Sequence, residues 1–106
     1  MKRRVVVTGI GAITPIGNSA NEFWNNIKKN KNGIDQITIF DTTDFKVKLA
    51  AEVKNFNVED YIGKKEAKRM DKYTQFAVIA SNEAVKDSKL DLDNIDKERI
   101  GVIFGS

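Results

Sequence analysis

The sequence predicts an α/β fold with a largely parallel sheet, and two observations lead to this class. Continuous apolar and β-branched runs near the two ends of the chain, Arg3–Thr8 and Ile100–Phe104, are typical of strands buried on both faces. The residues between them include stretches with helical apolar spacing, so that strands alternate with helices along the chain. That order favours parallel pairing, because parallel strands need a long crossover connection, which is usually a helix.

The first helix is predicted from Ser19 to Lys29. Ser19 and Glu22 form a capping box, in which the serine hydroxyl accepts a backbone hydrogen bond and the glutamate reaches back to the start of the helix. Apolar residues then recur at helical spacing. The stop signals are Asn30, Asn32 and Gly33.

The middle of the chain has weaker patterns. Gly33–Asp44 mixes polar and apolar residues without a period, so we expect an irregular connection with a short extended piece. Phe45–Leu49 alternates apolar and charged residues, the pattern of a half-exposed strand, which we expect to continue to Val53. Asn57 is suited to cap a short turn over residues 58–60.

A long helix is predicted over Lys64–Asp87, which contains neither proline nor glycine and has apolar residues at three- and four-residue steps. Small residues on this helix would let another backbone approach closely; they are Ala77, Ala80 and Ala84. The chain stops directly after its last predicted strand, where an α/β protein normally continues into a loop or helix. We therefore expect residues 1–106 to be an incomplete domain of a longer protein.

The composition of the chain excludes several classes of function. The 18 Lys and Arg residues exceed the 15 Asp and Glu residues by three, a mild surplus for a nucleic-acid binder. The 106 residues contain no Cys or His, and so no disulfide, thiolate nucleophile or imidazole base.

The chain shows no targeting or membrane signal. Its basic start is followed by only three apolar residues, Val5–Val7, and this apolar run is too short for the hydrophobic region of a signal peptide. No run approaches the roughly twenty apolar residues of a membrane span, so we expect a soluble, cytoplasmic protein.

Two motifs resemble ligand-binding sites, but each lacks a glycine that the site requires. Gly9-Ile10-Gly11 follows a strand as in dinucleotide-binding proteins, but Thr14 stands where the third glycine is needed, which favours a turn that ends the strand. Asp91–Asp96 is acidic but lacks the central glycine of a calcium loop, which favours a helix-capping loop. Ser106 has no visible activating base.

The basic residues cluster at the start of the predicted long helix. Three- and four-residue spacing would align them as a positive stripe; they are Lys64, Lys65, Lys68, Arg69 and Lys72. The stripe could be a solvated helix face with local Glu66 to Arg69 pairing. Alternatively, it could dock an acidic partner and accelerate its association.

Considered together, these segments resemble the start of the elongating β-ketoacyl-[acyl-carrier-protein] synthases, those of type II in particular. The resemblance is collinear over residues 2–106. The matching residues are Arg3–Gly11, Thr14–Asn18, Trp24, Gly33-Ile34, Phe40-Asp41, Phe56, Lys65-Glu66, Arg69-Met70-Asp71, Ile100-Gly101-Val102 and Gly105-Ser106.

The resemblance implies a thiolase-like αβαβα layered fold made of two related halves, in an enzyme that functions as a homodimer. Residues 1–106 would be an N-terminal fragment of the first half. The family joins an acyl group, held as a thioester on a cysteine, to malonyl-[acyl-carrier-protein] with loss of carbon dioxide, and histidines stabilise the developing charge. No organic or metal cofactor is implied. The cysteine and histidines of the family lie beyond residue 106, so we assign no catalytic residue and expect the chain alone to be inactive.

The resemblance also assigns the basic cluster. Family members meet their acidic, phosphopantetheine-bearing carrier protein with basic side chains at positions that match Lys65, Lys68 and Arg69, and Lys64 matches a position that is also basic. The docking interpretation is therefore favoured. Lys72 has no assigned role. Two alternatives stay open: a polyketide-type ketosynthase fragment, and a free-standing basic adaptor for an acidic protein. Nucleic acid is the weaker partner, because among aromatic residues only Tyr73 adjoins the cluster.

Overall fold

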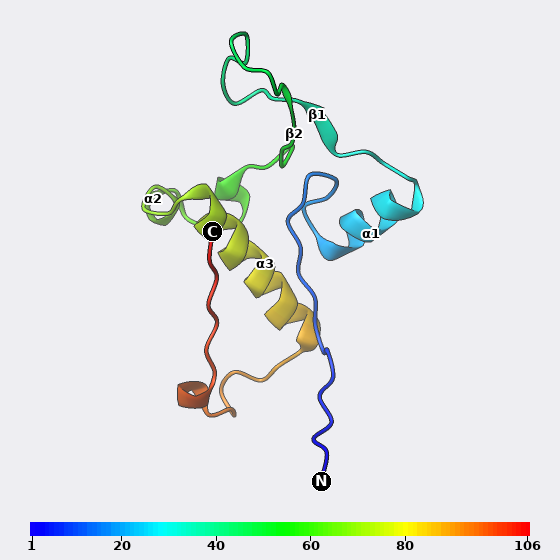
Figure 1. Ribbon diagram of the computed structural model, residues 1–106. Coiled ribbons are helices and arrows are strands. Elements are labelled where there is room, and N and C mark those ends of the chain that lie inside the picture. The colour runs from blue at the N-terminus through cyan, green and yellow to red at the C-terminus, as the bar shows by residue number, and fades with distance from the viewer. The chain divides into compact units, whose positions relative to one another are not determined.

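The computed structural model describes residues 1–106, which form two compact units, one of residues 1–11 with 58–106 and one of residues 12–57. The elements in chain order are α1 (Ala20–Lys28), β1 (Ile34–Gln36), β2 (Leu49–Ala51), α2 (Lys64–Ala67) and α3 (Lys72–Ser88), with single 3₁₀ turns at Val58–Asp60 and Lys97–Arg99 (Figure 1). The mixture of helices and strands agrees with the α/β class. None of the helices combines the length and apolar character needed to cross a bilayer.

Helix α1 confirms the first predicted helix. Ser19 is its N-cap, with Oγ accepting from the Glu22 backbone N–H at 3.1 Å. The Glu22 carboxylate accepts from the Asn18 N–H at 3.0 Å, one residue earlier than in a standard capping box. At the other end, Asn30 adopts a left-handed φ of 53° and its N–H donates to the Ile27 carbonyl at 2.9 Å. This is the asparagine stop that the sequence predicts.

The turn expected at Gly9–Gly11 lies further along the chain. Thr14 and Gly17 exchange backbone hydrogen bonds of 2.8 and 3.2 Å around Pro15 and Ile16. Proline suits the second position of such a turn because its φ is already fixed near the required value. The side-chain amide of Asn26 donates to the Ile16 carbonyl at 2.5 Å and ties the turn to α1.

Strands β1 and β2 form one short antiparallel pair, in which Ile34 lies opposite Ala51. Strand β1 is the short extended piece predicted within Gly33–Asp44. The strand predicted from Phe45 to Val53 is present but shorter than predicted, because the paired residues are Leu49–Ala51. The Phe45 N–H instead donates to Thr42, and the Phe40 and Phe45 rings pack edge-on at 5.4 Å. The alternating pattern thus belongs largely to a loop.

The single long helix predicted over Lys64–Asp87 is wrong. The chain leaves helical geometry after α2, and Asp71, with φ −66° and ψ 160°, is the extended N-cap from which α3 begins. No proline or glycine marks this break. The break is accompanied by a set of side-chain to backbone hydrogen bonds, described below, which local propensity does not reveal.

The N-terminal segment runs along the small-residue face of α3. A Cβ on Gly11 would lie 1.8 Å from the Ala80 carbonyl oxygen, and one on Gly9 would lie 2.2 Å from that of Ala84. The Ile10 N–H donates to the Asp87 carboxylate at 3.0 Å. The expected close backbone approach to these alanines is therefore confirmed. The two glycines permit this contact rather than a strand-ending turn.

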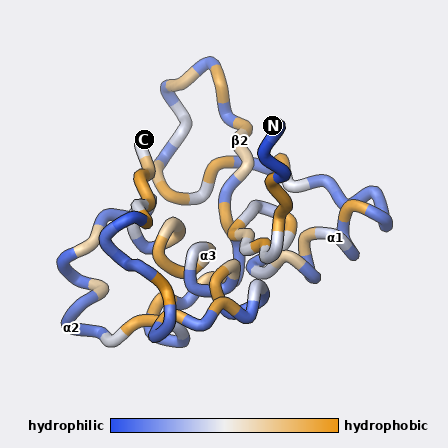
Figure 2. Tube along the Cα trace, turned by 90° about the horizontal axis from the view of Figure 1, so that it is seen from below, coloured by the Kyte–Doolittle hydropathy of each residue, from blue (hydrophilic) through white to orange (hydrophobic).

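The predicted strands at residues 3–8 and 100–104 are extended but pair with no strand of the chain. Val5 is 89% exposed and Ile103 is 97% exposed. Figure 2 shows the apolar stretches near both termini. The buried apolar side chains are Ile62, Ala67 and Ile79. The strand predictions are wrong for these residues because an apolar β-branched run becomes a strand only where another backbone pairs with it.

Candidate functional site

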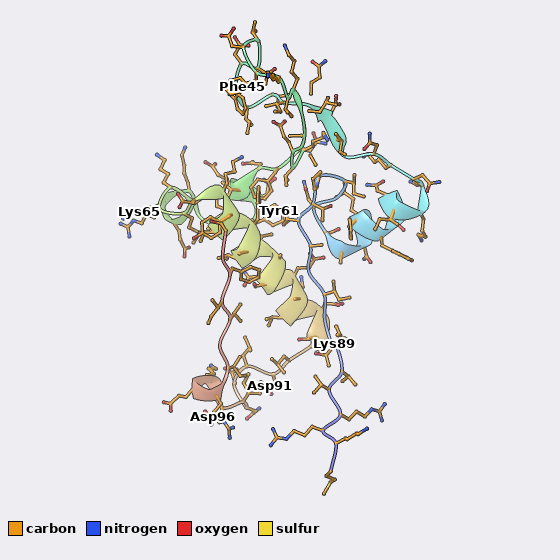
Figure 3. All side chains as sticks on the ribbon, in the orientation of Figure 1. Phe45, Tyr61, Lys65, Lys89, Asp91 and Asp96 are labelled. Carbon is orange, nitrogen blue, oxygen red and sulfur yellow. The ribbon has the colours of Figure 1, made fainter.

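The basic residues singled out by the sequence lie on one short stretch, residues 64–69, which we call the basic segment. Lys64 and Lys65 belong to α2, Lys68 is its C-cap, and Arg69 lies in the connection to α3. All four side chains are exposed. Figure 3 shows the side chain of Lys65 pointing away from α3. Lys72 begins α3 on the other side of the break, so the continuous stripe predicted on one helix does not form.

Local packing fixes which face of the basic segment meets solvent. Helix α2 begins after Gly63, whose carbonyl accepts from the Glu66 and Ala67 N–H groups at 3.0 and 2.9 Å. Ala67 is 4% exposed and Ile62, just before the helix, is 7% exposed. The burial of these two residues anchors the single turn of helix, because a helix of this length has little stability of its own. The lysines are consequently held on its outer side.

The break after α2 is closed by hydrogen bonds. The Met70 N–H donates to the Ala67 carbonyl at 3.1 Å, a tight one-turn ending. The side-chain amide of Gln75, in the first turn of α3, donates to the carbonyls of Ala67 and Met70 at 3.1 and 3.4 Å. These bonds give the backbone an alternative to continuing the helix. Sequence analysis did not single out Gln75, because a polar residue inside an amphipathic helix carries no distinct signal.

Charge compensation within the basic segment is uneven. The Lys64 ammonium lies 3.9 Å from the Glu59 carboxylate, in a pair whose side chains are 70% and 50% exposed. The expected Glu66 to Arg69 ion pair does not form, and these residues share a backbone hydrogen bond of 3.0 Å instead. Lys65, Lys68 and Arg69 have no ion-pair partner in the chain. Three uncompensated cations therefore face solvent, while the charge of Lys64 is partly offset.

The acidic residues considered as cation ligands hold hydrogen-bond donors of the chain. The Asp91 carboxylate accepts from the Asn94 side chain at 2.5 Å and from the Asp93 N–H at 3.1 Å, and these bonds lower the pKa of Asp91. Asp96 caps the 3₁₀ turn that follows by accepting from the Glu98 N–H at 3.3 Å. The segment is thus the capping loop that the sequence favours.

A cavity of about 390 Å³ lies between α3 and the C-terminal extended segment. Its lining residues are Tyr73, Thr74, Ala77, Val78, Ser81, Asn82, Val102 and Phe104. They include no charged group and no nucleophile–base pair, so the cavity carries no chemistry of its own. The small side chain of Ala77 was the one sequence signal for space at this face.

Comparison with known proteins identifies a family and relatives that match the chain. Residues 2–106 match the family described as beta-ketoacyl synthase, N-terminal domain. The 3-oxoacyl-[acyl-carrier-protein] synthase 2 of Staphylococcus aureus (strain N315) is 55% identical over 104 residues, which cover 98% of this chain and 25% of the relative. The protein of the same name from Synechocystis sp. is 46% identical over 105 residues, 99% of this chain and 25% of the relative. The chain thus spans about a quarter of the length of these relatives.

Two solved ketosynthase structures are similar to this chain. The ishigamide ketosynthase/chain length factor superposes with a TM-score of 0.79 at 35% identity, covering 90% of this chain and 24% of that one. A type II polyketide ketosynthase, in complex with its acyl-carrier protein, gives a TM-score of 0.67 at 26% identity, covering 91% and 25%. The α/β, thiolase-like fold class expected from the resemblance is confirmed. The chain belongs to the β-ketoacyl synthase family, as its N-terminal domain.

Proposed function

We propose that the chain forms the first part of a β-ketoacyl-[acyl-carrier-protein] synthase of fatty acid biosynthesis, and that its basic segment docks the acidic carrier protein. The observation that carries the proposal is the exposure of Lys65, Lys68 and Arg69 without ion-pair partners. They occur in a chain 55% identical to an enzyme whose name specifies a carrier-bound product, a 3-oxoacyl-[acyl-carrier-protein]. Residues 1–106 would form an incomplete first thiolase-like half of that enzyme.

Uncompensated cations suit a transient partner. Ammonium and guanidinium groups without an internal partner exert their full field on an approaching acidic surface, which accelerates association. They also need not break an existing ion pair to form a new one. Lys64 contributes less to the docking surface because Glu59 lies beside it. The carrier delivers its thioester to the rest of the enzyme while its acidic surface rests on the basic segment.

The reaction needs residues that this chain does not contain. Decarboxylative condensation uses a cysteine to hold the acyl group and histidines to stabilise the enolate oxygen formed as carbon dioxide leaves. The 106 residues include neither residue type. We therefore assign the chemistry to the remainder of a longer polypeptide, acting as a cytoplasmic homodimer without organic or metal cofactor. The isolated chain should be inactive.

A polyketide-type ketosynthase is the second candidate, because one of the solved structures described above is the ketosynthase of a type II polyketide system. The identities to the two solved structures, 35% and 26%, are lower than the 55% shared with the Staphylococcus aureus relative, which favours the fatty acid enzyme. A free-standing basic adaptor is disfavoured, because the family match extends over residues 2–106 and is not confined to the basic segment.

A chimaeric synthase tests the docking. In it, this chain replaces the matching quarter of the Staphylococcus aureus enzyme. The double change Lys68→Glu with Arg69→Glu should raise the KM for acyl carrier protein by about tenfold at low salt, equivalent to about 1.4 kcal/mol. The dissociation constant for the carrier, measured in parallel, should rise similarly even in a chimaera with weak activity.

The matched control is Lys29→Glu with Lys31→Glu, which changes the net charge equally on exposed residues of the other unit. It should leave both constants within about twofold, because the charges of the basic segment itself are unchanged. If the Lys68 and Arg69 variant behaves like this control at low salt, the basic segment does not dock the carrier.

A further inference from the structure

Gln75 links two consecutive helices, α2 and α3, through its side-chain amide. It lies in the first turn of α3, where its N–H donates to the Asp71 carbonyl at 3.0 Å. Its side-chain amide reaches back to the last residue of α2, Ala67, at 3.1 Å, and to Met70 at 3.4 Å. A single amide group therefore spans the turn that presents Lys68 and Arg69.

Backbone hydrogen bonds also restrain this turn. The Lys68 N–H donates to the Lys64 carbonyl at 3.3 Å, and the Arg69 and Met70 N–H groups donate to the carbonyls of Glu66 and Ala67 at 3.0 and 3.1 Å. The hydrogen bonds of Gln75 are partly buried, and Ala67 beside them is 4% exposed, so water is a poor replacement donor. Removing the amide would leave the Met70 carbonyl without that donor and would loosen the connection between α2 and α3.

The direction of the two cations depends on this turn. Neither Lys68 nor Arg69 has an ion-pair partner that would orient its side chain. The backbone of the turn sets the positions from which these two side chains extend. A partner that binds a preorganised set of cations loses less conformational entropy than one that must order them.

We propose that Gln75 is a positioning residue, whose amide holds the turn between α2 and α3 and thereby sets the affinity of the basic segment for its acidic carrier. The proposal rests on the docking function proposed above. Gln75 itself touches neither the carrier nor any reacting atom; it acts through Lys68 and Arg69.

The variant Gln75→Met in the chimaeric synthase tests the proposal, because methionine keeps the length of the side chain and removes both donors. We expect the KM and the dissociation constant for acyl carrier protein to rise about threefold to tenfold, with kcat unchanged. Condensation of acyl-coenzyme A with malonyl-coenzyme A, which involves no carrier protein, should keep its rate. Gln75→His, which retains one donor, should give an intermediate rise.

The matched control is Gln36→Met, the same replacement at an exposed position of β1, which should change neither substrate constant. If reversal of Lys68 and Arg69 weakens carrier binding but Gln75→Met does not, the role of Gln75 is overturned and the docking surface stands. If neither variant has an effect, the docking function itself fails. A loss of soluble protein, or an equal fall with both kinds of substrate, would show a purely structural role and also overturn the proposal.

Discussion

Gly11 shows how strictly one residue can be determined by its surroundings. A Cβ at this position would lie 1.8 Å from the Ala80 carbonyl oxygen and 2.9 Å from the Ala84 nitrogen, both of them backbone atoms that cannot rotate away. The sequence marks the glycine but not its purpose, since the same Gly-x-Gly pattern suits a turn or a phosphate loop. Only the approach of a helix explains it.

We predict that Gly11→Ala destabilises the chimaeric synthase by about 1–3 kcal/mol, the usual cost of forcing extra atoms into a packed contact. Urea unfolding followed by circular dichroism measures the change. Gly63→Ala is the control, because no atom lies within 4 Å of the added Cβ. It should cost less, about 0.5 kcal/mol, which is the usual difference between glycine and alanine at an N-cap. Equal effects of the two changes would contradict the close contact with α3.

Glu52 stabilises the base of the loop between β1 and β2. Its carboxylate accepts from the Thr38 hydroxyl at 2.8 Å, from the Thr38 N–H at 3.0 Å and from the Ile39 N–H at 3.4 Å. These bonds, chiefly those from Thr38, lower the pKa of Glu52 below its usual value. Because the folded-state pKa is the lower one, this stabilisation is fully present above the unfolded pKa of about 4.3 and is lost as the pH falls through the folded value.

We expect the Thr38 amide to exchange faster with solvent as the pH falls below about 4.3, after correction for the intrinsic pH dependence of exchange. Hydrogen exchange measured by NMR reports this residue directly. In Glu52→Gln, whose neutral side chain accepts at every pH, the corrected rate should stay level. A Thr38 transition centred above the ordinary glutamate pKa would show that the carboxylate does not accept these bonds.

At the scale of elements, α1 is the one helix whose start and end follow from its own residues. Its cap, Ser19, and its left-handed stop, Asn30, are both local signals, and both function as the sequence predicts. The Lys64–Asp87 helix is interrupted at the turn that the Gln75 amide spans, and the Phe45–Val53 strand is shortened to the residues in register with β1. No local stop signal marks either end.

Ser19→Ala should cost about 0.5–2 kcal/mol of stability in α1, the usual value of an N-cap hydroxyl. The Glu22 amide, which donates to Ser19 Oγ at 3.1 Å, should then exchange measurably faster. Asn21→Ala, at an exposed position of the same first turn, is the matched control and should leave that amide protected. Unchanged protection in Ser19→Ala would exclude the side-chain cap.

At the scale of the whole molecule, exposed apolar backbone is the dominant feature. Val5 and Val7 are 89% and 81% exposed, and Val102 and Ile103 are 71% and 97% exposed. Extended segments with unpaired N–H and C=O groups and apolar side chains readily pair with another chain. The relatives that match the chain are about four times as long as the matched region.

We therefore predict that the 106-residue chain self-associates when it is expressed alone. Sedimentation velocity at micromolar concentration should show concentration-dependent oligomers. Ile103→Lys should reduce the association, because the charge interrupts an unpaired strand. Val47→Lys, in a loop of the other unit and 71% exposed, should not. A monomer with sharp two-state melting would contradict the prediction.

The sequence by itself determined the family, the α/β class, the local signals of α1 and the small-residue face of α3. Each of these is encoded in neighbouring residues or in an ordered series of motifs along the chain. Tertiary structure decided where α2 ends, which residues pair in β1 and β2, which glycine contacts a helix, and which cations lack a partner. These properties depend on particular hydrogen bonds and close contacts, several of them between groups far apart in the sequence, and such contacts leave no pattern in local propensity.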